Sequence, residues 1–243
     1  MKNQFKHLYY WLFLFSFLLK LFLLEIPLAT AGFKPRNPKP ASDYSRTGGR
    51  RGCPSDKIPL TLLAPKTYIG YTSASHPTLI AFVSASHKIR WRIFEFNTKN
   101  IPQELGSPVE QNVSPGVFQL SWTKNQPELK AGKKYLWQVA IIDCVNSSSS
   151  KLVERAEFMV IEMPSVLKDK LLTTVSHQQQ ADIYAESDLW YEALATALKS
   201  AKSGQLGDVG LSLIQDLMKS ELPKKEEETQ QIQHLQKIIN LGN

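Results

Sequence analysis

The chain has 243 residues, of which 42% are hydrophobic, and it carries a formal net charge of +7. This length suits one or two domains with a substantial buried core. Residues 58–243 contain 19 basic and 19 acidic side chains. The excess positive charge therefore belongs to the N-terminal part, and the high net charge is not evidence for a basic face on the folded part.

The first 31 residues have the order of a secretory signal peptide. Lys2 and Lys6 precede an apolar run over residues 8–24, and Ala29 and Ala31 supply the small side chains of an A-x-A cleavage site. This order predicts that residues 1–31 are removed as a signal peptide. The mature protein is then exported to the periplasm or the cell exterior.

An uncleaved membrane anchor is the alternative interpretation of the same segment. A membrane-spanning helix needs about 20 apolar residues, whereas Lys20 lies within this run and Glu25 and Pro27 end it. The pattern therefore favours cleavage. If cleavage failed, the leader would be the protein's contact with a membrane.

A basic segment rich in proline and glycine occupies residues 32–52. Charge, proline and glycine without apolar periodicity predict a flexible linker. Two roles fit such a linker: attraction to acidic polysaccharide, lipid or nucleic acid, or a solvated spacer. The spacer is favoured, and no nucleic acid is expected as a partner of an exported chain.

The chain has two cysteines, Cys53 and Cys144, and both lie in the predicted mature part. In an oxidising compartment an even pair indicates a disulfide. The alternative is a catalytic thiol, which requires a nearby base. The sequence offers no base close to either cysteine, so the disulfide is favoured.

The region 53–163 shows a period of two, with turn residues at short intervals. Ile89, Trp91 and Ile93 alternate with basic residues, and the phase slips at Phe94, which indicates a bulge. Seven short strands in this length predict an antiparallel β-sandwich of the immunoglobulin or fibronectin type. The expected strands are 58–63, 67–72, 78–83, 88–96, 117–123, 135–144 and 152–162.

One local motif agrees with this fold. Leu129 lies six residues before Tyr135, which starts the strand that contains Trp137, and this spacing resembles the tyrosine corner of immunoglobulin-like and fibronectin type III sandwiches. There the tyrosine hydroxyl bonds to backbone just upstream, so we expect a structural role for Tyr135. The strand order of such a sandwich also brings Cys53, before the first strand, to the same end as Cys144.

Two groups of side chains in this region have both a structural and a functional interpretation. Three tryptophans occupy the expected strands: Trp91, Trp122 and Trp137. They are either a sugar-binding platform or core residues, and their places on the apolar phase favour the core. His76, His87 and Asp143 lie at strand ends without the spacing of metal ligands, so neither a metal site nor a cofactor is expected.

From residue 164 the period changes to 3.6. It predicts a helical region over 164–222, whose first long helix runs to Tyr184, and a charged C-terminal helix over 223–243. We expect the helical region to pack on the sandwich, with Trp190 as its anchor.

Four residues of the helical region have the spacing found in a single repeat unit of a helical repeat protein. Ala181, Tyr184, Trp190 and Ala193 resemble the helix pair of a tetratricopeptide repeat. About three such repeats are needed to bury their own faces. A packed helical hairpin is therefore favoured over a peptide-binding groove.

Several short stretches together resemble one family. They are Arg50-Arg51-Gly52-Cys53-Pro54, Leu62-Leu63-Ala64-Pro65, His76-Pro77-Thr78, Trp137 ahead of Cys144, and the run Asp188-Leu189-Trp190-Tyr191-Glu192-Ala193-Leu194-Ala195. Over about residues 50–220 the chain resembles a cyanobacterial family of exported proteins classed as a domain of unknown function. The resemblance implies a source and a compartment but no reaction. The Lys/Glu/Gln-rich end, 223–243, departs from the family's usual pattern.

The sequence contains no catalytic or cofactor motif, and the function predicted from it is a non-enzymatic, exported interaction or adaptor module of the bacterial cell envelope. Its partner is expected to be a protein or an envelope polysaccharide. Two alternatives stay open, a carbohydrate- or envelope-binding module and a hydrolase with scattered catalytic residues. Exposed aromatic side chains on a strand face would favour the first, and a cleft with a perturbed histidine or carboxylate would favour the second.

Overall fold

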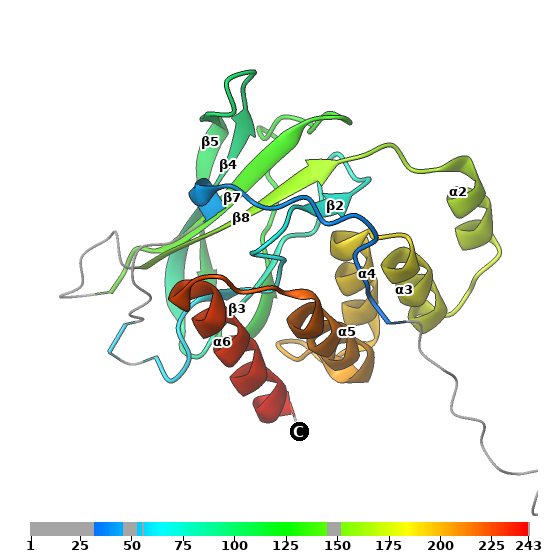
Figure 1. Cartoon of the computed structure of the whole chain (residues 1–243). Helices are drawn as coiled ribbons and strands as arrows, with labels where there is room; N and C mark the ends of the chain where they lie inside the picture. Colours follow the sequence, from blue (N-terminus) through cyan, green and yellow to red (C-terminus); the bar gives the residue numbers. More distant parts are fainter. Residues whose placement is uncertain (1–31, 46–52, 55, 145–151, 243) are drawn as a thin grey trace, which may run out of the picture. The chain divides into compact units, whose positions relative to one another are not determined.

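Figure 1 shows the computed structural model, which describes residues 32–45, 53–54, 56–144 and 152–242. The predicted signal peptide, with its cleavage site at Ala29 and Ala31, lies outside the described residues. The described residues, all from position 32 onward, belong to one compact unit. Within the described part, no helix combines the length and the apolar character needed to cross a lipid bilayer.

Two β-sheets form the body of the fold (Figure 1). The smaller sheet has the strand order β1 (Thr61–Leu62), β3 (Ile80–Val83), β6 (Gly116–Gln119). The larger sheet has the order β2 (Gly70–Thr72), β8 (Val153–Val160), β7 (Lys134–Ile141), β4 (His87–Phe96), β5 (Pro102–Val113). The pairs are antiparallel except β2–β8, which is parallel and departs from the fully antiparallel expectation.

Side chains from both sheets meet in one hydrophobic core. Alternate residues of two adjacent interior strands, β4 and β7, point into it, and they are at most 2% exposed: Ile89, Trp91, Ile93, Tyr135, Trp137 and Val139. Burial of a large apolar side chain stabilises a fold by about 1.5–3 kcal/mol. The alternation seen in the sequence therefore marks the strands that carry the core.

The strand β5 is not predicted by the sequence pattern, although each of the seven expected strands overlaps an observed one. It lies at the edge of its sheet and most of its side chains are exposed, so it has no apolar stripe. Its register with β4 shifts between Trp91 and Ile93. Gly106, with a φ of 74°, lies in the part of β5 opposite this shift. The bulge expected at Phe94 therefore occurs slightly earlier in the chain.

The described C-terminal region contains the helices α2 (Ser165–Leu172), α3 (His177–Glu186), α4 (Trp190–Ala197), α5 (Gly207–Ser220) and α6 (Glu226–Gly242). Short 3₁₀ turns form η1 (Asp43–Ser45) and η3 (Leu198–Ser200). The single long helix expected up to Tyr184 is instead divided into α2 and α3. The Ser176 side chain accepts a hydrogen bond from the backbone N–H of Gln179, and such a cap starts a new helix.

Two helices reach the sheets through side-chain donors. Trp190, which has no exposed surface, donates from its indole Nε1 to the carbonyl oxygen of Leu63 over 2.9 Å. Gln231 of α6 donates from Nε2 to the carbonyl oxygen of Leu62 over 2.7 Å. Because β1 is an edge strand, these donors satisfy carbonyl groups at the border of the smaller sheet. The helical region is thereby fixed to the sheets.

Residues 32–45 lie along the helices and the larger sheet, in blue in Figure 1. The Phe33 ring packs edge-on against Trp190, with ring centroids 4.8 Å apart. Farther along, the backbone N–H of Ser42 donates to the carboxylate of Glu157 over 3.0 Å. The expectation of a solvated linker is therefore wrong for this part. Hydrogen bonds from backbone groups hold it, and composition does not reveal them.

Candidate functional site

The two cysteines form a disulfide in the structure, with Cα atoms 5.8 Å apart. Cys53 precedes β1 and Cys144 follows β7. Cys53 is only 5% exposed, and Cys144 is partly buried. The two cysteines are 91 positions apart in the sequence, and a cross-link that closes a loop of roughly this length stabilises a fold by about 4–5 kcal/mol through chain entropy.

His87 lies beside this disulfide and between two aspartates. Its Nε2 is 2.8 Å from a carboxylate oxygen of Asp56, and its Nδ1 is 3.3 Å from one of Asp143. The side chains of His87 and Asp56 are 6% and 1% exposed. His76 does not join them, because its ring packs edge-on against Trp122 with centroids 4.9 Å apart.

Tyr135 is fully buried at the start of β7. Its hydroxyl oxygen accepts a hydrogen bond of 2.8 Å from the backbone N–H of Lys130, and its ring stacks on Phe158. Burial raises the pKa of Tyr135, so the hydroxyl stays protonated. The contact ties the loop before β7 to the strand itself.

The tryptophans do not form an exposed platform. Trp91 and Trp137 have no exposed surface. Trp122 is partly buried, and its indole N–H donates to the carbonyl oxygen of Pro77 over 2.8 Å. A sugar-binding surface made of these three side chains is therefore excluded.

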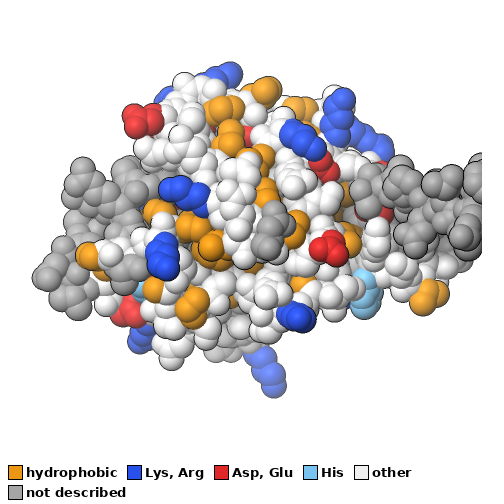
Figure 2. Space-filling model, turned by 90° about the horizontal axis from the view of Figure 1, so that it is seen from below, with side chains coloured by type: hydrophobic (Ala, Val, Ile, Leu, Met, Phe, Trp, Pro, Cys, Tyr) orange, Lys and Arg blue, Asp and Glu red, His pale blue; other side chains and the backbone are white. Residues whose placement is uncertain are grey.

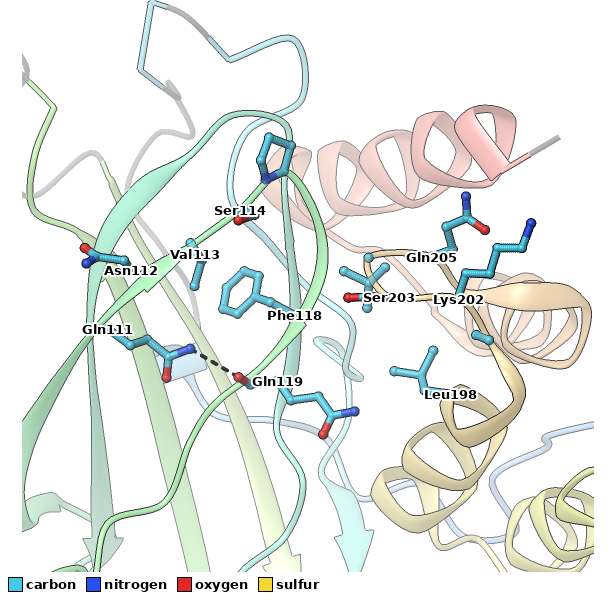
Figure 3. Close-up of a pocket in the computed structure, with 14 residues that line it drawn as sticks. Gln111, Asn112, Val113, Ser114, Phe118, Gln119, Leu198, Lys202, Ser203 and Gln205 are labelled. Atoms are coloured by element: carbon cyan, nitrogen blue, oxygen red, sulfur yellow. Dashed lines mark hydrogen bonds between the residues drawn. The ribbon is translucent and has the colours of Figure 1, made fainter.

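A groove of about 520 Å³ lies between two segments that are distant in sequence. Residues 111–119 at the β5–β6 turn form one wall, and residues 198–205 after α4 form the other (Figure 3). The backbone N–H of Val117 donates to the carbonyl oxygen of Gly204 over 2.9 Å. This bond fixes the distance between the two walls.

Glycines at the contact allow the walls to approach. Gly116 has a φ of 113° and Gly204 a φ of 79°, conformations that other residues rarely adopt. A Cβ atom on Gly116 would also clash with the carbonyl group of Gly204. The shape of the groove therefore depends on glycine at position 116.

Neutral polar side chains and one lysine dominate the groove. The amides come from Gln111, Asn112, Gln119 and Gln205, the hydroxyls from Ser114 and Ser203, and the ammonium group from Lys202. Phe118 and Leu198 add apolar surface. The amide of Gln111 is engaged, because it donates to the carbonyl oxygen of Gln119 and accepts from the N–H of Ser121. The other polar side chains of the groove are exposed to solvent.

A second hollow, of about 550 Å³, adjoins the groove and shares Pro115 and Gly204 with it. Its walls are largely apolar and include Phe82, and Lys57 and Lys237 contribute ammonium groups. Among the described residues that line the two hollows there is no aspartate or glutamate. Figure 2 shows the molecule from below, where hydrophobic side chains are scattered among basic and acidic ones.

Comparison with protein families matches residues 46–231 to the family described as Domain of Unknown Function (DUF928). The match covers more than half of the chain. The chain belongs to the DUF928 family. Comparison with curated proteins found no match. The resemblance drawn from the sequence is thus confirmed at the level of a family of unknown function.

The DUF928 match contains both walls of the groove, the disulfide and His87. It ends within α6, so Lys237 of the second hollow lies beyond the matched residues. Sequence reasoning missed the groove because glutamine, serine and lysine are ordinary loop residues. The available signals were the turn dipeptides Pro115-Gly116 and Ser203-Gly204, but nothing in them indicates that the two turns meet.

Proposed function

We propose that this DUF928 protein is an exported, non-enzymatic interaction module of the bacterial cell envelope, and that its groove binds an acidic envelope polysaccharide. The signal-peptide pattern supports export, and the disulfide between Cys53 and Cys144 suits an oxidising compartment. The residues that carry the family resemblance support a cyanobacterial source.

The fold type that we propose is an immunoglobulin-like sandwich. Both sheets contribute to one core, and the hydroxyl of Tyr135 bonds to backbone five residues upstream, at Lys130. This bond supports the tyrosine-corner interpretation. Such sandwiches present their binding residues on loops at the ends of the sheets, as the β5–β6 turn does here.

The observation that carries the ligand assignment is the chemistry of the two hollows. Amide and hydroxyl groups both donate and accept hydrogen bonds, which matches the hydroxyl groups of a sugar. Phe118 offers an apolar surface for the C–H face of a sugar ring. Lys57, Lys202 and Lys237, with no carboxylate among the described lining residues, favour a negatively charged chain.

The same lining supports binding over hydrolysis. Most glycoside hydrolases place two carboxyl groups on either side of the scissile bond. The described residues of the two hollows supply hydroxyls, amides and ammonium groups instead. A bound polysaccharide would therefore be held and released unchanged.

Calorimetry with oligomers of polygalacturonate tests the ligand assignment, with neutral dextran as the control probe. We expect binding of polygalacturonate that weakens as salt rises, because exposed charges are screened. Lys202→Ala should weaken binding by up to about fivefold, the equivalent of about 1 kcal/mol for an exposed charge pair. Lys99→Ala removes an equal charge from an exposed residue outside both hollows and should leave binding unchanged.

Two results would overturn this assignment. One is an affinity for polygalacturonate that is no higher than that for dextran. The other is an equal effect of Lys202→Ala and Lys99→Ala, since that would show attraction to net charge without a site.

Export is tested separately, by N-terminal sequencing of the protein recovered from its native host. The predicted cleavage after Ala31 gives a mature chain that begins at Gly32. Recovery of chains with intact Met1 in the membrane fraction would show an uncleaved anchor.

A further inference from the structure

We propose that the disulfide region is a redox-gated metal site. When the Cys53–Cys144 bridge is reduced, its two thiolates and the side chains of His87 and Asp56 hold one zinc-like divalent cation. In the oxidised protein the sulfur atoms are bonded to each other, and the site does not hold the ion. None of these four residues is among those that line the groove.

The potential ligand atoms are already close together. The Sγ atom of Cys53, a carboxylate oxygen of Asp56 and a ring nitrogen of His87 all lie within 4.8 Å of one another. Cys144 brings a second sulfur, since it is bonded to Cys53. Metal–ligand bonds of about 2.0–2.3 Å in a tetrahedral site place neighbouring ligand atoms roughly 3–4 Å apart. Small side-chain movements therefore suffice to form the site.

The position of His87 suits a metal ligand. Its Nε2 faces Asp56 at 2.8 Å, while its Nδ1 faces Asp143 on the opposite edge of the ring at 3.3 Å. Metal-binding histidines commonly donate their second ring N–H to a carboxylate, which fixes the ring and directs the other nitrogen to the ion. The carboxylate of Asp143 is placed to accept that hydrogen bond from His87. Asp143 is itself held in position, because it accepts a hydrogen bond from the backbone N–H of Lys88.

Asp56, like Asp143, is held in position by a hydrogen bond from a backbone N–H group. One of its carboxylate oxygens accepts a hydrogen bond of 2.9 Å from the backbone N–H of Cys53, and the other faces His87. The Asp56 side chain is 1% exposed and Cys53 is 5% exposed. Burial of this kind limits the access of competing water to Asp56 and Cys53.

The ligand set indicates the class of metal. Two thiolates, one imidazole and one carboxylate match the tetrahedral sites of zinc, whereas calcium and magnesium prefer oxygen ligands alone. Zinc itself undergoes no redox change. The oxidation state of the two sulfur atoms therefore decides whether the ion is held.

The gating reaction balances with a dithiol as reductant. The dithiol gives two electrons and two protons to the bridge, which yields two cysteine thiols and the oxidised, disulfide form of the reductant. Binding of one divalent ion to the two sulfurs then releases both protons to solvent. Exchange with a small disulfide reverses the process: the small disulfide takes up the two electrons and two protons to become a dithiol, the Cys53–Cys144 bridge forms again, and the ion is expelled.

The test uses the purified protein, reduced with a phosphine and titrated with Co²⁺ in the absence of oxygen. We expect one ion per chain, with thiolate-to-cobalt charge-transfer absorption that Zn²⁺ abolishes by displacement. The oxidised protein should show neither. Asp143→Asn should weaken Co²⁺ binding by roughly 10–100-fold, the usual effect of losing the partner of a metal-binding histidine. His76→Ala is the matched control, because it removes a histidine that lies elsewhere, and it should leave Co²⁺ binding unchanged.

Circular dichroism separates this outcome from binding by an unfolded chain. If reduction disorders the protein, Co²⁺ should restore the parent spectrum, and restoration should require more metal in Asp143→Asn. The Asp143 side chain is 41% exposed, so this variant should fold as the parent does. The proposal is overturned if the reduced protein takes up no Co²⁺, if the oxidised protein binds it equally well, or if Asp143→Asn binds it like the parent.

Discussion

The indole N–H of Trp190 and the carbonyl oxygen of Leu63 form a hydrogen bond of 2.9 Å between residues 127 positions apart. Leu63 directly follows β1, and Trp190 begins α4. Phe33 packs against the same indole ring. Three distant segments of the chain therefore meet at one side chain, which makes Trp190 the anchor between the helices and the sheets.

Replacement of this anchor should destabilise the whole unit. Trp190→Ala removes a fully buried aromatic side chain and should lower the free energy of unfolding by about 3–5 kcal/mol. Trp190→Phe keeps much of the apolar volume but loses the donor, and should cost less. Urea denaturation measures both, and a Trp190→Ala protein as stable as the parent would contradict the anchoring role.

The hydroxyl of Tyr135 should contribute to stability without any role in binding. Tyr135→Phe leaves the backbone N–H of Lys130 without its acceptor, at a cost of about 1–3 kcal/mol. Tyr44→Phe is the control, because Tyr44 is 42% exposed. Equal denaturation midpoints for the two variants would show that the Tyr135 hydroxyl contributes nothing.

Gly116→Ala should be more damaging than Gly132→Ala, although both glycines have positive φ. Left-handed backbone costs an ordinary residue roughly 1–2 kcal/mol, and Gly132 has open space around its missing Cβ. At Gly116 a clash with the carbonyl group of Gly204 adds to this cost. Thermal melting of both variants gives the comparison, and similar losses would show that the approach of the two groove walls is not tight.

Asp188 should make stability depend on pH. Its carboxylate accepts a hydrogen bond from the backbone N–H of Arg36, and burial raises its pKa above the ordinary value. For an acid whose pKa is raised in the folded state, the stabilising contribution is complete below the unfolded-state pKa of about 3.9 and is lost as the pH rises through the folded-state pKa.

Asp188→Asn removes this titration while keeping an acceptor oxygen, and asparagine tolerates the φ of 63° at this position. The variant should therefore gain stability relative to the parent between acid and neutral pH. Denaturation midpoints from about pH 3 to pH 7 measure the difference. Parallel curves for the two proteins would contradict the assignment.

The sequence by itself determined the elements that have a local pattern. Apolar alternation marks the strands containing Trp91 and Trp137, because a half-buried strand must place its apolar side chains at every second position. A period of 3.6 marks the helices, because the buried face of a helix recurs at that period. The even pair of cysteines indicated the bridge that the structure contains, since an even count and the predicted oxidising compartment suffice for that inference.

Tertiary structure alone decided which distant polar residues meet. The edge strand β5 has no apolar stripe, and residues 32–45 are held through backbone N–H groups, which every residue type except proline carries. The groove and the contact between His87 and Asp56 likewise join segments with no shared local pattern. Periodicity records which side of an element is buried, whereas the pairing of loops depends on how the elements pack, and only the folded chain contains that information.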